Sequence, residues 1–329
     1  MDTTKNDFGF KTLINEKDLQ DGQSKIENDK PNNKYRTNLP NEGTNFKYED
    51  YIKLTVKGYN KEVNLKTFCS YNTDKPKAAI YLFHGLGSFS DHSTGLAKFL
   101  ADSDYFVCSI DLREHGYSDG ELGYIYSLDD AINDSFKFVK LTEEFTEKKF
   151  NCVLPKFIAG ISMGGMISNY VSRQINFNGV IYFAPCFNID MGSFFKYSVS
   201  IFSFFYPTKK LPGFPETIST VVKNPVFTEK RCPISEKRGP TVGTVNALFS
   251  KCKDFNNKGN KSHENSALFI VAGVDKCVSN KSILDYYNSS KVKDKTMWYY
   301  PNMWHFIYFE EEMEHILPNL KNWIDQRIK

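Results

Sequence analysis

The 329-residue sequence lacks several features that would assign it to large classes of protein. No apolar run reaches the roughly 18 residues that a membrane-spanning helix needs, and the first residues contain no apolar segment typical of a secretion signal. Charge of one sign is not in excess, because 42 Lys and Arg residues stand against 39 Asp and Glu residues. We therefore expect no nucleic-acid partner and a cytoplasmic location, with peripheral membrane contact as the alternative.

Cysteine is present, but without the spacing that zinc sites or disulfide frameworks require. The seven cysteines are an odd number, widely separated, and no two of them form a Cys-x-x-Cys pair. They are Cys69, Cys108, Cys152, Cys186, Cys232, Cys252 and Cys277. We expect reduced thiols, no metal site and no cofactor.

The N-terminal segment, residues 1–45, differs in composition from the rest of the chain. It is rich in Asn, Lys, Asp and Glu and poor in large apolar residues, so it cannot bury enough apolar surface to offset the entropy lost on ordering. We predict a mobile polar leader. Apolar residues then alternate over 52–56 and again over 63–67, which predicts a β-hairpin.

The body of the chain alternates short apolar runs with helical patterns. The runs 78–83, 105–110, 156–159, 180–183 and 268–271 are continuously apolar, as in parallel strands that are buried on both faces. This alternation predicts a doubly wound, mostly parallel α/β sheet. Function is then expected at the carboxyl ends of its strands.

The alternation stops between residues 187 and 263. An aromatic stretch over 194–206, followed by a proline-rich part, predicts a cap inserted into a core formed by residues 46–186 and 264–329. Within the cap, the polar run 251–260 predicts a loose surface loop that leads back into the sheet.

The segment 160–164 reads GISMG and follows the apolar run 156–159 directly. A Gly-x-Ser-x-Gly sequence between a strand and a helix is typical of a nucleophile elbow, a strained turn that exposes the serine and tolerates only small residues on either side. Ser162 is therefore the candidate nucleophile. The alternative is an ordinary glycine-rich turn with an idle serine.

A serine hydroxyl needs a histidine to take its proton and a carboxylate to orient that histidine. Asp275 follows the apolar run 268–271, and His305 follows the strand-like residues 297–300. The resulting chain order, serine then acid then histidine, is that of α/β-hydrolases. Asp275 could instead cap the following helix, and His305 could be a buried structural histidine.

The oxyanion of an acyl-transfer intermediate needs hydrogen-bond donors, and two backbone amides usually supply them. Met163 directly follows the candidate nucleophile, and Leu86 lies in the glycine turn after the run 78–83. We predict that these two N–H groups form the oxyanion hole. The alternative for Leu86 is an ordinary turn between a strand and a helix.

Candidate substrate contacts lie in two places. His84 precedes the same glycine turn, and the predicted cap contributes Phe194, Phe195, Phe202 and Phe205. These aromatic residues could line an acyl pocket or touch a membrane surface transiently. The alternatives are packing against the core and burial within the cap itself.

Together, these motifs resemble those of the monoglyceride lipase and lysophospholipase group of α/β-hydrolases, and more loosely the lysophospholipase-like proteins of malaria parasites. The resemblance covers most of residues 50–329. It is carried by FHGLGS at 83–88, DLREHGYSDG at 111–120, GISMGG at 160–165, GVD at 273–275 and WH at 304–305. The chain departs from the family pattern at Glu114, where Gly is usual, and at Ile161, where His is common.

The resemblance implies an α/β-hydrolase fold with a mobile cap over a lipid tunnel. It also implies a triad of Ser162, Asp275 and His305, with the amides of Leu86 and Met163 as the oxyanion hole. The predicted function is hydrolysis of a single-chain lipid ester, a lysophospholipid or a monoacylglycerol, through an acyl-Ser162 intermediate. The alternatives are a general small-ester hydrolase or peptidase on the same fold, and a catalytically silent lipid-binding module.

Overall fold

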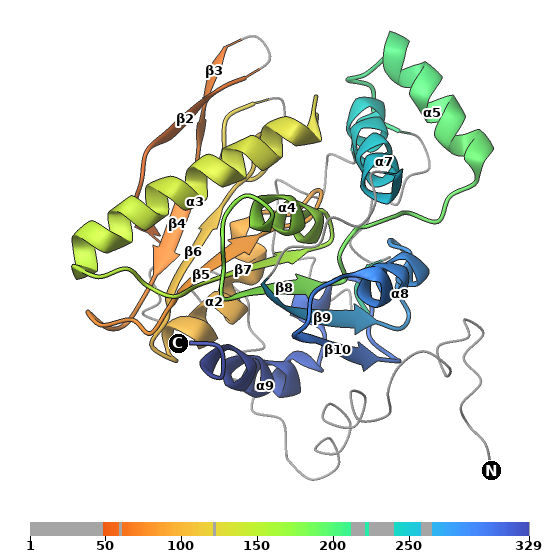
Figure 1. The fold of residues 1–329 in the computed structure, drawn as a ribbon. Coiled ribbons are helices and arrows are strands. Elements are labelled where there is room, and N and C mark those ends of the chain that lie inside the picture. Colours follow the sequence, from red (N-terminus) through yellow and green to blue (C-terminus); the bar gives the residue numbers. More distant parts are fainter. Residues whose placement is uncertain are drawn as a thin grey trace, which may run out of the picture.

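A computed structural model of the chain describes residues 49–58, 61–120, 123–211, 221–223, 240–257 and 265–328. Its centre is an eight-stranded sheet in the order β1-β4-β6-β5-β7-β8-β9-β10 (Figure 1). The strands of this sheet are β1 (Glu49–Asp50), β4 (Thr67–Ser70), β5 (Ala79–Phe83), β6 (Phe106–Ile110), β7 (Lys156–Ile161), β8 (Gly179–Phe183), β9 (Ser266–Ala272) and β10 (Lys295–Tyr300).

All neighbouring strands from β6 to β10 are parallel, whereas β1 and β4 join the sheet in antiparallel register. Every residue of β5, β6 and β8 is buried, which explains why these strands have continuous apolar sequences instead of alternating ones. The predicted doubly wound, mostly parallel sheet is confirmed. The predicted hairpin is also confirmed, because β2 (Leu54–Lys57) pairs antiparallel with β3 (Glu62–Leu65).

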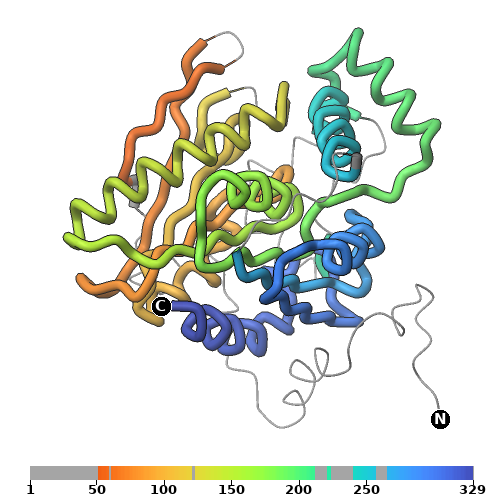
Figure 2. The backbone as a smooth tube through the Cα atoms, viewed as in Figure 1, coloured from red at the N-terminus to blue at the C-terminus, as the bar shows by residue number. Residues whose placement is uncertain are grey.

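Helices cover both faces of the sheet. In Figures 1 and 2, α3, α4 and α8 lie over one face, and α2 and α9 lie over the other. The bounds are η3 (Ser90–Ser93), α2 (Thr94–Ala101), α3 (Leu128–Phe150), α4 (Met163–Ser172), α8 (Asn280–Ser289), η5 (Ile307–Phe309) and α9 (Met313–Asp325). Among the helices that the structure describes, none combines the length and the apolar character that a membrane crossing requires.

Among the described residues between β8 and β9, two helices stand inside the range predicted to form a cap. These are α5 (Ser193–Phe205) and α7 (Val242–Asn257), and they pack against each other at one corner of the molecule (Figure 1). The predicted leader, and residues 212–220, 224–239 and 258–263 of the predicted cap, lie outside the described residues. The domain limits therefore stay a prediction.

The loop predicted over residues 251–260 is wrong in its first part, because α7 continues to Asn257. Cys252 and Phe255 lie one helical turn apart and both are buried. The Phe255 ring stacks on Phe187 with ring centroids 4.5 Å apart. Tertiary packing of this apolar face thus stabilises a helix whose sequence is mostly polar.

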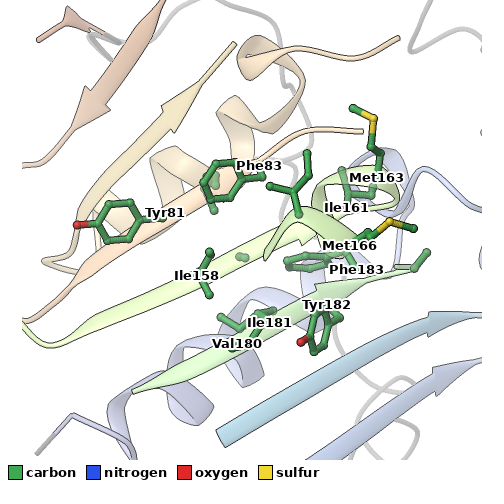
Figure 3. Close-up of a cluster of buried hydrophobic side chains, with 14 of the residues drawn as sticks. Tyr81, Phe83, Ile158, Ile161, Met163, Met166, Val180, Ile181, Tyr182 and Phe183 are labelled. Atoms are coloured by element: carbon green, nitrogen blue, oxygen red, sulfur yellow. The ribbon is translucent and has the colours of Figure 1, made fainter. Parts of the chain in front are cut away.

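The core beneath the turn from β7 into α4 is densely apolar. Figure 3 shows side chains of β5, β7, β8 and α4 gathered there, among them Ile161, Met166 and Phe183. These three side chains have no exposed surface. The turn is therefore supported by a rigid, close-packed base.

Candidate active site

Ser162 occupies the turn between β7 and α4 in a strained backbone conformation. Its φ is 55° and its ψ is −119°, a region that residues other than glycine rarely adopt. The Ser162 N–H donates to the carbonyl of Phe183 at 3.0 Å, and its carbonyl accepts from the N–H of Cys186 at 2.9 Å. These two bonds anchor the strained residue to the end of β8, which is how such a conformation persists in a folded protein.

Glycines on either side of Ser162 are required by close backbone approaches. A Cβ on Gly160 would lie 2.2 Å from the carbonyl oxygen of Gly164, and a Cβ on Gly164 would lie 2.2 Å from the carbonyl oxygen of Phe83. Both distances are far shorter than van der Waals contact. The small residues two positions before and after the serine are therefore a steric necessity of this turn.

Asp275 and His305 lie side by side in the structure, although they are 30 residues apart in the chain. The Nδ1 of His305 donates to Oδ2 of Asp275 at 2.7 Å, and the Asp275 side chain is fully buried. The other carboxylate oxygen, Oδ1, accepts the N–H groups of Cys277 at 2.8 Å and Val278 at 3.0 Å. Because the carboxylate only accepts, Nδ1 carries a proton, so in the neutral ring the lone pair that can act as a base lies on Nε2.

The loops after β9 and β10 hold this pair through backbone contacts. The N–H of Gly273 donates to the carbonyl of Tyr300 at 2.8 Å, and the N–H of Val274 donates to the carbonyl of Met303 at 3.0 Å. A Cβ on Gly273 would lie only 2.5 Å from the carbonyl oxygen of Pro301. Close approach of the two loops, which only glycine permits, brings the acid to the histidine.

Ser162 and the Asp275–His305 pair lie at the same edge of the sheet, because β7, β8, β9 and β10 are parallel neighbours. Phe183 connects them: its carbonyl binds the Ser162 N–H, and its ring packs on Tyr308 with centroids 5.1 Å apart. Among the described hydrogen bonds, none joins Ser162 Oγ to His305. Such catalytic hydrogen bonds often shorten only when substrate binds.

Two amides are predicted to form the oxyanion hole, one directly after Ser162 in the chain and one in the glycine turn after β5. Met163 is the first residue of α4, so its N–H has no acceptor within the helix and lies at the positive end of the helix dipole. Leu86 follows Gly85, where a Cβ would lie 3.2 Å from Cβ of Ser162. The glycine turn after β5 therefore passes directly beside the candidate nucleophile.

His84, which the sequence predicts as a substrate contact, is buried in the turn after β5. It is 4% exposed, and its ring nitrogens both bind backbone groups: Nδ1 donates to the carbonyl of Gly85 at 2.8 Å, and Nε2 accepts from the N–H of Leu112 at 2.9 Å. Burial lowers the pKa of His84 to about 4, so the ring is neutral near pH 7. Both ring nitrogens are thus occupied by backbone groups, one in the turn after β5 and one in the loop after β6.

The predicted aromatic contacts of the cap lie on α5 and are exposed. The exposed fractions are 84% for Phe194, 37% for Phe195, 58% for Phe202 and 66% for Phe205. Phe195 contacts Phe249 of α7, with ring centroids 6.5 Å apart. The described contacts do not bring any of the four to Ser162 or His305.

Three side chains near the site each offer an atom that could bind a metal ion, and these atoms lie within 4.8 Å of one another. They belong to Asp275, Cys277 and His305. Burial, with a smaller contribution from the charge of Asp275, raises the pKa of Cys277 to about 12. Cys277 is thus a neutral thiol near pH 7. Because the acid and the histidine are already bonded to each other, the group fits a catalytic pair better than a metal site.

Sequence reasoning did not identify Glu310, which supports the histidine loop. Glu310 is 5% exposed, and its Oε1 accepts the N–H of Lys223 at 3.1 Å. The nearby N–H of Phe306 donates to the carbonyl of Val221 at 2.9 Å. Segment 221–223 is thereby bound next to His305. The sequence gives no signal for the buried position of Glu310, because it lies in a run of three glutamates at 310–312 and such runs are usually solvent-exposed.

Comparison with known proteins extends over most of the chain. Residues 74–312 match the family model described as serine aminopeptidase, S33. Monoglyceride lipase of Rattus norvegicus is 25% identical over 270 residues, which is 79% of this chain and 87% of that protein. Monoglyceride lipase of Homo sapiens is 24% identical over 269 residues, with the same coverage of both chains. Phospholipase YtpA of Bacillus subtilis is 26% identical over 125 residues, 37% of this chain and 46% of that protein.

Solved structures of similar proteins share the architecture. A soluble variant of monoglyceride lipase from Saccharomyces cerevisiae superposes with a TM-score of 0.73 at 17% identity, covering 88% of this chain and 98% of that one. The monoacylglycerol lipase of Paleococcus ferrophilus superposes with a TM-score of 0.66 at 19% identity, covering 80% and 99%. The fold predicted from the sequence is thereby confirmed.

Proposed function

Because the chain belongs to the serine aminopeptidase S33 family of α/β-hydrolases, we propose that it hydrolyses esters of single-chain lipids through an acyl-Ser162 intermediate. The observation that carries this proposal is the oriented Asp275–His305 pair, at the same sheet edge as a serine held in a strained turn. A base, the group that orients it and a nucleophile are the parts that acyl transfer needs.

In the proposed mechanism, Nε2 of His305 takes the proton of Ser162 Oγ as that oxygen attacks the ester carbonyl carbon. The N–H groups of Leu86 and Met163 stabilise the resulting oxyanion. The tetrahedral intermediate collapses, and His305 gives its proton to the leaving alcohol. Water, deprotonated by His305 in turn, then attacks the acyl group and regenerates Ser162, while Asp275 keeps the imidazole in one tautomer throughout.

Two observations support a lipid ester as the substrate. The relatives with the widest coverage are named monoglyceride lipases, and a further relative is named a phospholipase. In addition, α5 exposes an unusual number of large apolar side chains for a protein surface, including Phe194, Phe204 and Phe205. The head group, glycerol or a glycerophosphate ester, is left to experiment.

We also propose that residues 187–263 form a cap whose α5 touches the lipid surface that holds the substrate. Val199 is the buried residue of α5, whereas aromatic side chains project from most of the helix. Aromatic rings partition into the boundary between head groups and acyl chains. Contact of this kind is transient, and it leaves the hydrolase core in water.

The description of the matching family favours one second candidate, a peptidase that removes N-terminal residues. The same serine, histidine and acid can cleave an amide by the same two steps. The substrate is selected by the residues around the site, so the fold does not decide between ester and amide.

The test compares four substrates: a 1-monoacylglycerol, a 1-acyl lysophosphatidylcholine, a short p-nitrophenyl ester and an aminoacyl p-nitroanilide. We expect turnover of at least one lipid to exceed that of the short ester. Ser162→Ala should lower turnover by a factor on the order of 10⁶, as in serine hydrolases whose nucleophile was removed. Labelling by a fluorophosphonate should be lost in the same variant.

Ser168→Ala is the matched control, because Ser168 is a buried serine of α4, the helix that follows Ser162, and its hydroxyl has no hydrogen-bond partner among the described residues. It should keep near wild-type activity. Turnover of the p-nitroanilide alone would favour the peptidase. Lipid binding without turnover of any substrate would contradict the proposal and favour a silent binding module.

A further inference from the structure

A single peptide group connects His84 to the proposed oxyanion hole. His84 Nδ1 lies 2.8 Å from the carbonyl oxygen of Gly85. That carbonyl belongs to the same peptide unit as the N–H of Leu86, one of the two proposed oxyanion donors. The unit is planar and, as the described chain contains no cis peptide, it is trans. Its C=O and N–H therefore point in opposite directions.

The hydrogen bonds of His84 define one tautomer. A carbonyl oxygen can only accept, so Nδ1 must donate to Gly85; the N–H of Leu112 can only donate, so Nε2 must accept. The ring is therefore neutral and fixed at both ends. It also lies beside the His115 ring, with centroids 5.1 Å apart.

We propose that His84 is a positioning residue that holds the Gly85–Leu86 peptide so that the Leu86 N–H is aimed at the developing oxyanion. The Nδ1 hydrogen bond holds the carbonyl on the His84 side, which turns the N–H of the same unit away from the ring. Gly85 itself lies against the nucleophile, since a Cβ there would be 3.8 Å from Ser162 Oγ. This role rests on the proposed acyl transfer at Ser162.

Three possible roles of His84 can be told apart, because a positioning residue, a substrate contact and a purely structural bond affect kcat, KM and stability differently. Donors that are aligned before the reaction stabilise the transition state, so their misalignment lowers kcat and leaves substrate binding nearly unchanged. A lost substrate contact would instead raise KM. A bond that only joins the loops after β5 and β6 would change stability and leave the kinetics of folded enzyme unaffected.

Two isosteric substitutions separate the two ends of the ring. In His84→Asn the amide nitrogen takes roughly the place of Nδ1, so it can still donate to Gly85 while the bond to Leu112 is lost. In His84→Gln the amide oxygen reaches the place of Nε2, so the bond from Leu112 is kept and the bond to Gly85 is lost. The proposal predicts that Asn preserves catalysis and that Gln does not.

The experiment measures kcat and KM on a short p-nitrophenyl ester, and the affinity for an alkyl boronic acid, which forms a tetrahedral adduct with the serine. We expect His84→Gln to lower kcat by about 10- to 10²-fold, somewhat less than the loss of a whole oxyanion donor, with KM changed less than about threefold. Boronate affinity should fall in parallel. His84→Asn should recover kcat to within about fivefold of wild type.

His115→Gln is the control, because His115 is equally buried beside His84 but its Nδ1 bonds to the carbonyl of Arg113, in another loop. It should leave kcat and boronate affinity near wild type. A crystal structure of His84→Gln supplies a readout independent of turnover, and the Gly85–Leu86 peptide should be rotated in it.

Several results would overturn the proposal. If kcat were preserved in His84→Gln and not in His84→Asn, the role of His84 would be limited to its hydrogen bond from Leu112. A rise in KM at constant kcat would instead make His84 a substrate contact. An unrotated peptide in the Gln variant would refute the positioning role whether or not the enzyme turns over. An inactive wild type that fluorophosphonate does not label would instead refute the proposed function.

Discussion

Replacing Asp275 with asparagine should remove most of the hydrolytic activity while leaving the fold intact. Oδ1 of Asp275 accepts two backbone N–H groups, from Cys277 and Val278. In the variant, these two donors will orient the amide oxygen of the asparagine into the position of Oδ1. The amide NH₂ of the asparagine is then directed at Nδ1 of His305, where the carboxylate accepts at 2.7 Å. A donor at that position forces the histidine proton onto Nε2, the nitrogen that must take the proton of Ser162.

The size of the effect follows from this tautomer. To act as a base, His305 would have to carry its proton on Nδ1, facing another N–H group instead of an acceptor. The same substitution in the triad of a serine protease lowers kcat about 10⁴-fold. This corresponds to about 5 kcal/mol of lost transition-state stabilisation, and we expect the same order here.

The assay is kcat on a p-nitrophenyl ester near pH 7.5, together with the melting temperature. Asp285→Asn is the control, since Asp285 is an exposed aspartate of α8 that forms an ion pair with Lys281, one turn away on the same helix. It should leave both values near wild type. A kcat of Asp275→Asn within about tenfold of wild type would refute the assignment of Asp275 as the residue that orients the base.

Three further predictions concern stability and lipid binding. Burial lowers the pKa values of His84 and His115 to about 4 and about 3, so these rings stay neutral where the unfolded chain takes up protons. In urea titrations, each ring lowers the unfolding free energy by up to about 1.4 kcal/mol per pH unit as pH drops from 6.5 towards 4. Asp91 contributes with the opposite sign, because burial raises its pKa to about 6. The loss of stability over this range should therefore be smaller in His84→Asn than in wild type, and an equal slope would contradict this. Gly164→Ala drives a Cβ to 2.2 Å from a carbonyl oxygen of β5, so it should destabilise the protein by about 3 kcal/mol or more in the same titration, whereas Gly192→Ala, with open space around it, should not. Replacing Phe202 and Phe205 together with serine should weaken sedimentation with phosphatidylcholine vesicles at least about tenfold, because each buried ring contributes about 1.5–3 kcal/mol. Unchanged vesicle binding would remove α5 from the contact surface.

Local sequence was sufficient for the features that depend on short-range sterics. The apolar runs predicted the parallel strands, since strands buried on both faces need apolar side chains throughout. The resemblance to the monoglyceride lipase and lysophospholipase group is confirmed by the family match and by the relatives. The elbow could be predicted because its glycines are imposed by the turn itself: the clash at Gly160 is with Gly164, four residues away.

Other features depend on partners that are distant in the chain, and the sequence did not reveal them. The run 251–260 is polar and was expected to be a loop, yet α7 extends through its first part because Phe255 packs on Phe187. His84 was predicted as a substrate contact, and nothing in the sequence indicated its hydrogen bond from Leu112, which the parallel pairing of β5 with β6 brings close. A histidine in a glycine turn has the same sequence signature in either role.

The sequence by itself therefore determined the class of fold, the family and the chain order of a candidate serine, acid and histidine, because these follow from periodicity, backbone sterics and motif spacing. Only the tertiary structure decided which groups meet. The 2.7 Å contact of Asp275 with His305 exists because β9 and β10 are parallel neighbours whose loops leave the same edge of the sheet. The His84 ring is likewise neutral and hydrogen-bonded at both nitrogens because it is buried among residues from separate strands. No local sequence pattern encodes that burial.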